Sequence, residues 1–536
     1  MFSFHTRARS LIPVSAITDY HLKSEAYIEE VEDVEEDVEE QGRQHTCQYI
    51  LIGLLFLADA MMQSSLSSSV DALLPTNSSC VTMESSFLRS IMQCAYYLGA
   101  STGLVWGMAA DSMGRRRVAL ISLWGSLICC FSMAFATTFA AFAGLRYVAG
   151  VFGSAGPIAA LALLADLTHA SKQRTWLVAR LPLVVVVGGQ VGPLLSAAIT
   201  HFAQRHFHAV LTDYPALGGQ TACGLVVLLI TIAEGLLLRE TLPTLKSTRE
   251  EEDSIDCEKA AFLGQSHSNN SQDSLAISIV DALHDDAPST SPLPSHITIS
   301  QLLTAPSVLI LLASFSALSL HSSTFDLLLP HLGQHATQDI GLGLPCALLQ
   351  PVMLVVKVVA AASMLCIPAL VDKIGLMRLY RTISLTFPAL YILLPIIALA
   401  TAGCGESDVL AGAFSTLATL LKTTLTSAAQ VLVLLLALSM APDASSTGTL
   451  IGVISIAEMF KALAVGIAGV SYFLSDDYSM WMVNGALWTA LAVIASLGAL
   501  ITRRLRETTR VGTDLPEECL VWQGMFDVDS EDEAGF

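Results

Sequence analysis

Long apolar stretches dominate this sequence and restrict the folds that are open to it. Twelve windows of roughly 20 mostly apolar residues, the length that an α-helix needs to cross a bilayer, follow one another along the chain. Inside lipid, backbone polar groups must find their partners within the protein, so these windows predict helices. Hydrophobic residues make up 53% and charged residues 14% of the 536 positions, which is too apolar a balance for a soluble chain.

The windows fall into two sets of six, separated by a polar segment rich in serine and acidic residues. The sequence therefore predicts an all-α membrane protein with 12 transmembrane helices in two six-helix bundles. The predicted spans are 48–70, 87–110, 117–136, 139–165, 176–200, 216–238, 307–329, 344–370, 382–402, 411–440, 450–473 and 481–502.

The net charge of −20 belongs mainly to the segments outside the spans. Of the 47 acidic residues, 30 lie in 1–45, 241–300 and 505–536, where like charges repel one another and favour a solvated chain. Valines in the first block recur every third or fourth position, so a helix formed on a partner is an alternative there. The predicted organisation is a disordered acidic cytoplasmic tail (1–46), an N-terminal six-helix bundle (47–240), a cytoplasmic linker (241–305), a C-terminal six-helix bundle (306–503) and a second acidic cytoplasmic tail (504–536).

Lysine and arginine predict the orientation in the membrane. Alternate loops hold sixteen of these residues on one side and only Arg89 and Arg205 on the other, so the basic side is expected to face the cytoplasm. Both termini are then cytoplasmic. The glycosylation sequon at Asn77 falls in the first outward loop, where sugar attachment is expected, whereas the sequon at Asn269 falls in the linker and is expected to stay unmodified.

The loop between the second and third spans contains the most specific motif. Gly107, Asp111 and Gly114 precede Arg115 and Arg116 in a tight, basic turn. Gly107 allows another helix to approach closely, and Gly114 can adopt the positive φ that a short reversal needs. This pattern resembles the loop signature of the major facilitator superfamily. The alternative is a cluster of positive charges at a helix end.

A weaker copy of this motif follows the eighth span, at 371–375, where Asp372 and Gly375 repeat the spacing of the acidic residue and the glycine. The resemblance implies two related halves with the substrate site between them near the middle of the membrane. It extends over residues 48–502.

Two more motifs resemble patterns of the superfamily. Arg146, in the fourth span, is followed by spaced glycines, and the resemblance implies that it assists proton exchange. Asp166, at the other end of that span, would join Asp111 and Arg115 in a charge cluster that controls opening. In the fifth span the motif of Gly188, Gly192 and Pro193 resembles that of the antiporter branches, although Ser196 and Ala197 replace its last glycines; a proline-kinked packing helix is the alternative.

Placing a charged side chain inside the membrane costs free energy, so the charged residues within the spans are treated as functional candidates. Asp59 in the first span and Asp326 in the seventh are placed to face one cavity, where a carboxyl group can carry a proton, although Asp326 lies close enough to the membrane edge to reach water instead. Lys357 needs a partner, for which Asp326 is the nearest candidate in the sequence. Glu458 and Lys461 are three residues apart and can pair on one helix face, with a purely neutralising role as the alternative.

These features predict a secondary active transporter of a small organic solute that works by alternating access, with proton-coupled antiport or efflux preferred. A uniporter or a proton symporter for a nutrient, sugar or metal chelate is the second hypothesis, and a transport-inactive membrane sensor is the third. No ATP-binding loop, hydrolase motif, cofactor motif, metal-ligand cluster or nucleic-acid footprint is found, so an enzyme is not expected. The expected partners are the solute, protons and lipid, with the chain a monomer in the plasma or vacuolar membrane.

Overall fold

The computed structural model describes residues 43–65, 83–168, 170–206, 216–242, 304–334, 346–403, 408–441, 444–477 and 479–505, with single positions at 214, 302, 339 and 341. The chain divides into two units, Met1–Leu51 and Ile52–Phe536. Residues 43–51 of the first unit are helical, and the second unit contains residues 52–65 of the first helix and all the other helices discussed below. Most of both predicted tails, the linker and Asn77 lie outside the described residues.

The described part of the second unit is helical, in the order that the apolar windows predicted. The first span is the helix Arg43–Ser65. The helices of the first half that follow are α2 (Met83–Ala100), α3 (Gly103–Met113), α4 (Arg115–Ala134), α5 (Phe139–Leu167), α6 (Ser171–His206) and α8 (Leu217–Leu237). Those of the second half are α12 (Pro306–Gln334), α13 (Cys346–Ser363), η2 (Met364–Cys366), α14 (Ile367–Ile374), α15 (Leu376–Gly403), α16 (Asp408–Met440), η3 (Ala444–Ser446), α17 (Thr447–Ser455), α18 (Glu458–Asp477) and α19 (Met480–Arg503).

Eleven helices among the described residues are long and apolar enough to cross a membrane. The predicted second span, 87–110, is divided between α2 and α3 by a break at Ser101 and Thr102. Both hydroxyl groups bond to backbone carbonyls in the preceding turn, at 2.8 Å, and so compete with the helical hydrogen bonds. The predicted order of twelve spans is kept, with the second span in two pieces.

A second break in a predicted span contacts the break in the second span. The eleventh span is divided into α17 and α18 by a turn at Ile456 and Ala457. The two breaks touch, because a Cβ atom added to Gly103, at the start of α3, would lie only 1.9 Å from the hydroxyl oxygen of Ser455, at the end of α17.

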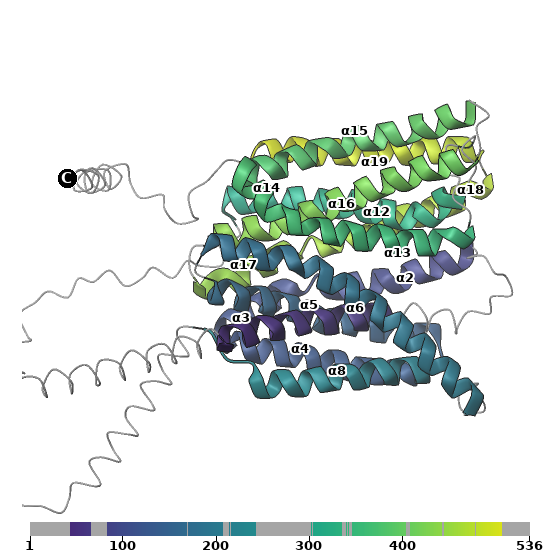
Figure 1. Cartoon of the computed structure of the whole chain (residues 1–536). Coiled ribbons are helices and arrows are strands. Elements are labelled where there is room, and N and C mark those ends of the chain that lie inside the picture. The colour runs from purple at the N-terminus through teal and green to yellow at the C-terminus, as the bar shows by residue number, and fades with distance from the viewer. Residues whose placement is uncertain are drawn as a thin grey trace, which may run out of the picture. The chain divides into compact units, whose positions relative to one another are not determined.

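The two halves have the same turn at equivalent points. Gly114 and Gly375 are the positive-φ glycines of the described chain, at φ 105° and 90°, and each follows the second span of its half. The predicted reversal at Gly114 is confirmed, and the copy at Gly375 supports the internal repeat. Figure 1 shows the ends of α3 and α14 on the same side as α17. We call this side, with Arg115 and Arg116, the basic end.

Helices of one half pack mainly on one another, and a few contacts join the halves. In the first half α4 and α2 pack on α5, and in the second α15 and α12 pack on α19. Figure 1 shows the purple-to-teal helices of the first half beside the green-to-yellow helices of the second. Between the halves, α3 packs on α17 and α2 on α18. Three of these segments, α2, α17 and α18, line the cavity described below.

Candidate functional site

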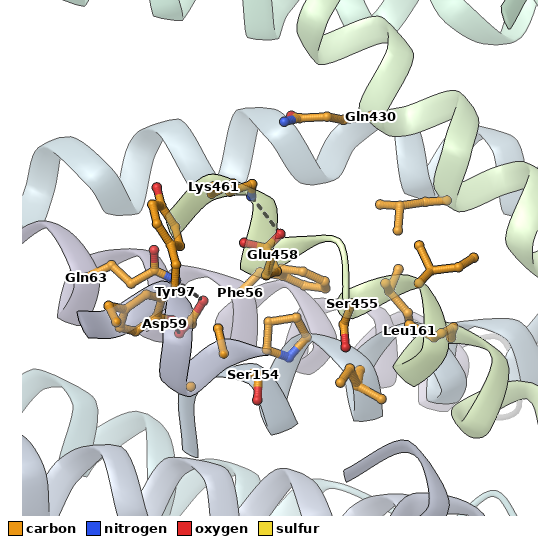
Figure 2. Close-up of a pocket in the computed structure, with 18 of the residues that line it drawn as sticks. Phe56, Asp59, Gln63, Tyr97, Ser154, Leu161, Gln430, Ser455, Glu458 and Lys461 are labelled. Carbon is orange, nitrogen blue, oxygen red and sulfur yellow. Dashed lines mark hydrogen bonds and ion pairs between the residues drawn. The ribbon is translucent and has the colours of Figure 1, made fainter. Parts of the chain in front are cut away.

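A cavity of about 320 Å³ lies between the two halves. Its polar lining comes from the first helix, α2, α5, α16, α17 and α18, and aromatic side chains border it as well (Figure 2). The polar and aromatic lining residues are Phe56, Asp59, Gln63, Tyr96, Tyr97, Ser154, Phe315, Gln430, Ser455, Glu458 and Lys461. A pocket of this size, largely apolar with a few converging polar groups, suits a small organic molecule.

Asp59 is a cavity carboxylate held by neutral groups. Its Oδ2 accepts a hydrogen bond from the side-chain amide of Gln63 at 2.7 Å, and its Oδ1 lies 3.5 Å from the hydroxyl of Tyr96. Gln63 is one helical turn further along the same helix, so the two side chains share a face. No cation of the described chain lies within ion-pair distance of Asp59, and its negative charge is available to a ligand.

Arg146 lies behind this carboxylate. Its side chain is buried, and its guanidinium lies 4.5 Å from the centre of the Tyr96 ring. It donates hydrogen bonds to the backbone oxygen of Gln63, at 3.1 Å, and to the side-chain oxygen of Gln93, at 3.2 Å. Tyr96 and Gln63 therefore contact both charged groups, and they connect Asp59 to Arg146 without a direct ion pair.

Glu458 and Lys461 form the predicted pair on α18. The ammonium of Lys461 lies 2.6 Å from the carboxylate of Glu458 and 5.5 Å from the ring centre of Tyr97 on α2. Figure 2 shows this pair across from Asp59 and Gln63. Because Lys461 neutralises Glu458, Asp59 supplies the unbalanced negative charge of the lining.

The predicted pairing of Asp326 with Lys357 is wrong. Asp326 on α12 forms its ion pair with Lys422 on α16, at 2.6 Å, whereas Lys357 on α13 is exposed and has no ion pair within the described chain. Proximity in the sequence was a poor guide, since α12 also packs on α16 and Lys422 there is buried and requires a counter-charge.

At the basic end, Asp111 joins the two halves. Its carboxylate accepts hydrogen bonds from the backbone N–H of Gly448 at 2.9 Å, from the N–H of Thr449 at 2.6 Å and from the Thr449 hydroxyl at 2.8 Å. These amides open α17, and a helix leaves its first N–H groups unpaired and partly positive. Gly107 makes the approach possible, because a Cβ atom there would lie 2.3 Å from the carbonyl oxygen of Gly448.

Arg115 completes the predicted charge cluster within the first half. Its side chain is fully buried, forms an ion pair with Asp166, lies 3.8 Å from Asp111 and donates to the carbonyl of Ala162 at 3.1 Å. The cluster of Asp111, Arg115 and Asp166 is therefore present as predicted. Arg115 ties the loop to α5 and leaves both oxygens of Asp111 directed at α17.

Glu240, just after α8, is a member of this cluster that the sequence patterns did not identify. Its carboxylate accepts hydrogen bonds from the backbone N–H groups of Arg115 at 3.0 Å and Arg116 at 3.1 Å, and so caps the start of α4. The Arg116 side chain in turn donates to the carbonyl of Gly235 at 2.6 Å. The Arg-Glu pair that closes the sixth span was the available signal, but nothing in the sequence linked it to a loop over 100 residues earlier.

The antiporter-like motif is a packing surface on α6. Cβ atoms added to Gly188 and Gly192 would lie 2.7 Å and 2.6 Å from the backbone oxygens of Leu57 and Met61. The glycines therefore bring α6, which also contains Pro193, against the helix that contains Asp59. Among the described residues no cluster of three or more potential metal ligands occurs.

Comparison with known proteins decides the family. The model of the Major Facilitator Superfamily matches residues 51–466. The chain belongs to the major facilitator superfamily. It is therefore a multi-pass integral membrane protein that transports a solute, and it is not an enzyme.

Among curated proteins, this transporter is 24% identical over 452 residues to the "Major facilitator superfamily multidrug transporter mfsB" of Aspergillus fumigatus, which covers 75% of this chain and 73% of that protein. It is also 24% identical over 298 residues to the "Major facilitator-type transporter psiT2" of Psilocybe cubensis, over about half of each chain (53% and 54%).

Solved structures share the fold. The human organic anion transporter MFSD10 has a TM-score of 0.55 at 16% identity, over 85% of this chain and 99% of that one. The proton:xylose symporter XylE has a TM-score of 0.56 at 17% identity, over 87% and 97%. A bacterial homologue of the iron transporter ferroportin, in an outward-facing state, has a TM-score of 0.57 at 15% identity, over 86% and 99%.

Proposed function

We propose that this transporter exchanges protons for a small organic cation with an aromatic or apolar body, by alternating access between the two sides of the membrane. The observation that carries this proposal is Asp59, a cavity carboxylate held only by neutral donors among the described residues. A carboxylate in such a place binds either a proton or a cationic ligand, and competition between the two couples their movements in opposite directions.

The lining favours a cation over an anion. Glu458 and Lys461 balance one another, which leaves the charge of Asp59. Rings of Phe56, Tyr97 and other aromatic residues border the cavity and suit the apolar body and positive charge of an organic cation. The match to a protein named a multidrug transporter agrees with a substrate of this type.

The contact of Asp111 with α17 supplies the gate in this proposal. It joins α3 of the first half to α17 of the second at the basic end, and alternating access requires that contact to break and re-form. We place the basic end in the cytoplasm, as the distribution of lysine and arginine predicts. Both termini are then cytoplasmic.

The test uses proteoliposomes that contain the full chain, an acidic interior and a membrane potential held at zero with potassium and valinomycin. The probe is radiolabelled methylphenylpyridinium, a permanently charged aromatic cation. We expect the wild type to accumulate the probe and Asp59→Asn to lose accumulation, since an amide cannot bind the proton. Asp372→Asn, the same change at an exposed site, is the matched control and should behave like the wild type.

Undiminished accumulation by Asp59→Asn would remove Asp59 from the coupling mechanism. Equilibration of the probe by the wild type without any response to the pH gradient would indicate a uniporter instead.

A further inference from the structure

Gln430 is a polar side chain of the cavity that has no part in the fold or in the proposed proton exchange. It is on α16, in the second half, and its partly exposed side chain lines the cavity. Its amide forms no hydrogen bond within the described chain. The other glutamine of the lining, Gln63, donates to the carboxylate of Asp59 at 2.7 Å. The amide of Gln430 is therefore available to a ligand.

Other neutral polar groups of the lining are engaged or belong to the charged part of the site. The hydroxyl groups of Ser154 and Ser455 donate to backbone carbonyls of their own helices, at 3.0 Å and 2.6 Å. The hydroxyl of Tyr97 has no hydrogen bond among the described residues either, but the centre of its ring lies 5.5 Å from the ammonium of Lys461. Gln430 is thus the unpaired amide of the cavity.

Gln430 lies apart from the charged groups. Figure 2 shows it on one side of the ion pair of α18, with Asp59 on the other side of that pair. Apart from Ser455, the lining residues that α16 and α17 place in the same wall are apolar, namely Leu434, Ile451 and Ile454. The cavity therefore has a charged end and, away from it, an amide in a mainly apolar wall.

An amide in this position discriminates between solutes. It offers one carbonyl acceptor and two N–H donors, which water can satisfy while the cavity is empty. A solute that fills the cavity displaces this water. If the solute is apolar at that point, the amide is left without a partner and binding is weakened, whereas a hydroxyl, carbonyl or amide group of the solute replaces the lost hydrogen bonds.

We propose that Gln430 is a specificity-determining residue, and that the substrates are organic cations with a hydrogen-bonding group on the side of the apolar body opposite to the charge. The inference rests on the proposed function, in which Asp59 binds the positive charge. In the bound state the cationic group lies at Asp59, the apolar body lies along the leucine and isoleucine side chains, and the hydroxyl, carbonyl or amide group bonds to Gln430.

Such a solute links the two halves. Asp59 is on the first helix of the first half, and Gln430 is on α16 of the second half. A solute that bonds to both residues is held from two sides, and each hydrogen bond becomes stronger as closure excludes water from the cavity. The hydrogen-bonding group therefore favours closure around the solute as well as binding.

The experiment measures competition with the uptake of radiolabelled methylphenylpyridinium in the proteoliposomes described above. The unlabelled competitors are analogues of this probe with a hydroxymethyl or an ethyl group at the meta or para position of the phenyl ring. The two groups have nearly the same shape, but only the hydroxymethyl group forms hydrogen bonds. Inhibition constants of each pair are compared for the wild type, for Gln430→Leu and for Gln173→Leu, the same change at an exposed position outside the cavity.

We expect the hydroxymethyl analogue to be the stronger competitor for the wild type at one ring position or both. There, the ratio of the ethyl to the hydroxymethyl inhibition constant should be about tenfold higher for the wild type than for Gln430→Leu, because the variant has lost the amide and keeps the apolar wall. Gln173→Leu should keep the wild-type ratio.

Equal ratios for the wild type and Gln430→Leu at both ring positions would overturn the inference. If Gln430→Leu does not fold, the wild type still tests it, since stronger competition by the ethyl analogues at both positions would also overturn it. In either case, pH-driven accumulation of the probe by the wild type would leave the proposed function intact. Absence of that accumulation would instead overturn the proposed function, and the inference with it.

Discussion

Replacing Asp111 by Asn tests the contact that closes the basic end. The carboxylate accepts three hydrogen bonds from Gly448 and Thr449, and it also faces the positive start of α17. An amide is neutral and offers one oxygen, so at least one of the two backbone donors loses its acceptor. At about 1.5–3 kcal/mol for a hydrogen bond to a charged group, we estimate that the closed state loses roughly 2–4 kcal/mol relative to the open state. That corresponds to a shift of roughly 30- to 700-fold in their ratio.

The assay is hydrogen–deuterium exchange of the peptide that contains the first turn of α17. The amides of Gly448 and Thr449 have no partner within their own helix, so their protection depends on Asp111. We expect Asp111→Asn to speed their exchange by a factor of that size. Asp372→Asn, at the equivalent point of the second half but exposed, should leave the exchange unchanged. Equal protection of α17 in Asp111→Asn and the wild type would refute the reasoning.

Two further changes test the packing of the first half. A Cβ atom at Gly150 would lie 2.1 Å from the carbonyl oxygen of Tyr96, so Gly150→Ala should lower the free energy of unfolding by about 1–3 kcal/mol. Gly144→Ala is the control on the same helix, because a Cβ atom there would have no neighbour within 4 Å, and it should not destabilise the protein. Equal unfolding temperatures for the two variants would contradict this prediction. Arg115→Met leaves the Asp166 carboxylate without its buried partner and should lower the free energy of unfolding by about 3–5 kcal/mol. An unfolding temperature like that of the wild type would show that the ion pair does not stabilise the fold.

Features that depend on residues close together in the sequence could be predicted from it. The order of the spans follows from apolar length, the reversal at Gly114 from a glycine between two spans, and the pair of Glu458 and Lys461 from a spacing of three on one helix. The break between α2 and α3 was missed, since Ser101 and Thr102 are also compatible with a continuous helix.

Contacts between helices far apart in the sequence could not be predicted in this way. Lys422 was one of several charges within the spans, and only the packing of α12 on α16 shows that it is the partner of Asp326. Glu240 lies over 100 residues from the amides that it caps, and Asp111 lies over 300 residues from the start of α17. Without an alignment, a sequence contains no direct record of such pairs.

The touching breaks in the second and eleventh spans bear on how this transporter bends. A continuous helix is stiff, so a tilt imposed at one membrane face is transmitted to the other. Here both spans are interrupted at the level where Gly103 contacts Ser455. At the basic end α3 can therefore move away from α17, while on the other side of the two breaks α2 stays packed on α18. We therefore expect an intermediate that is shut at both faces, with the solute enclosed, to be a stable stage of the cycle.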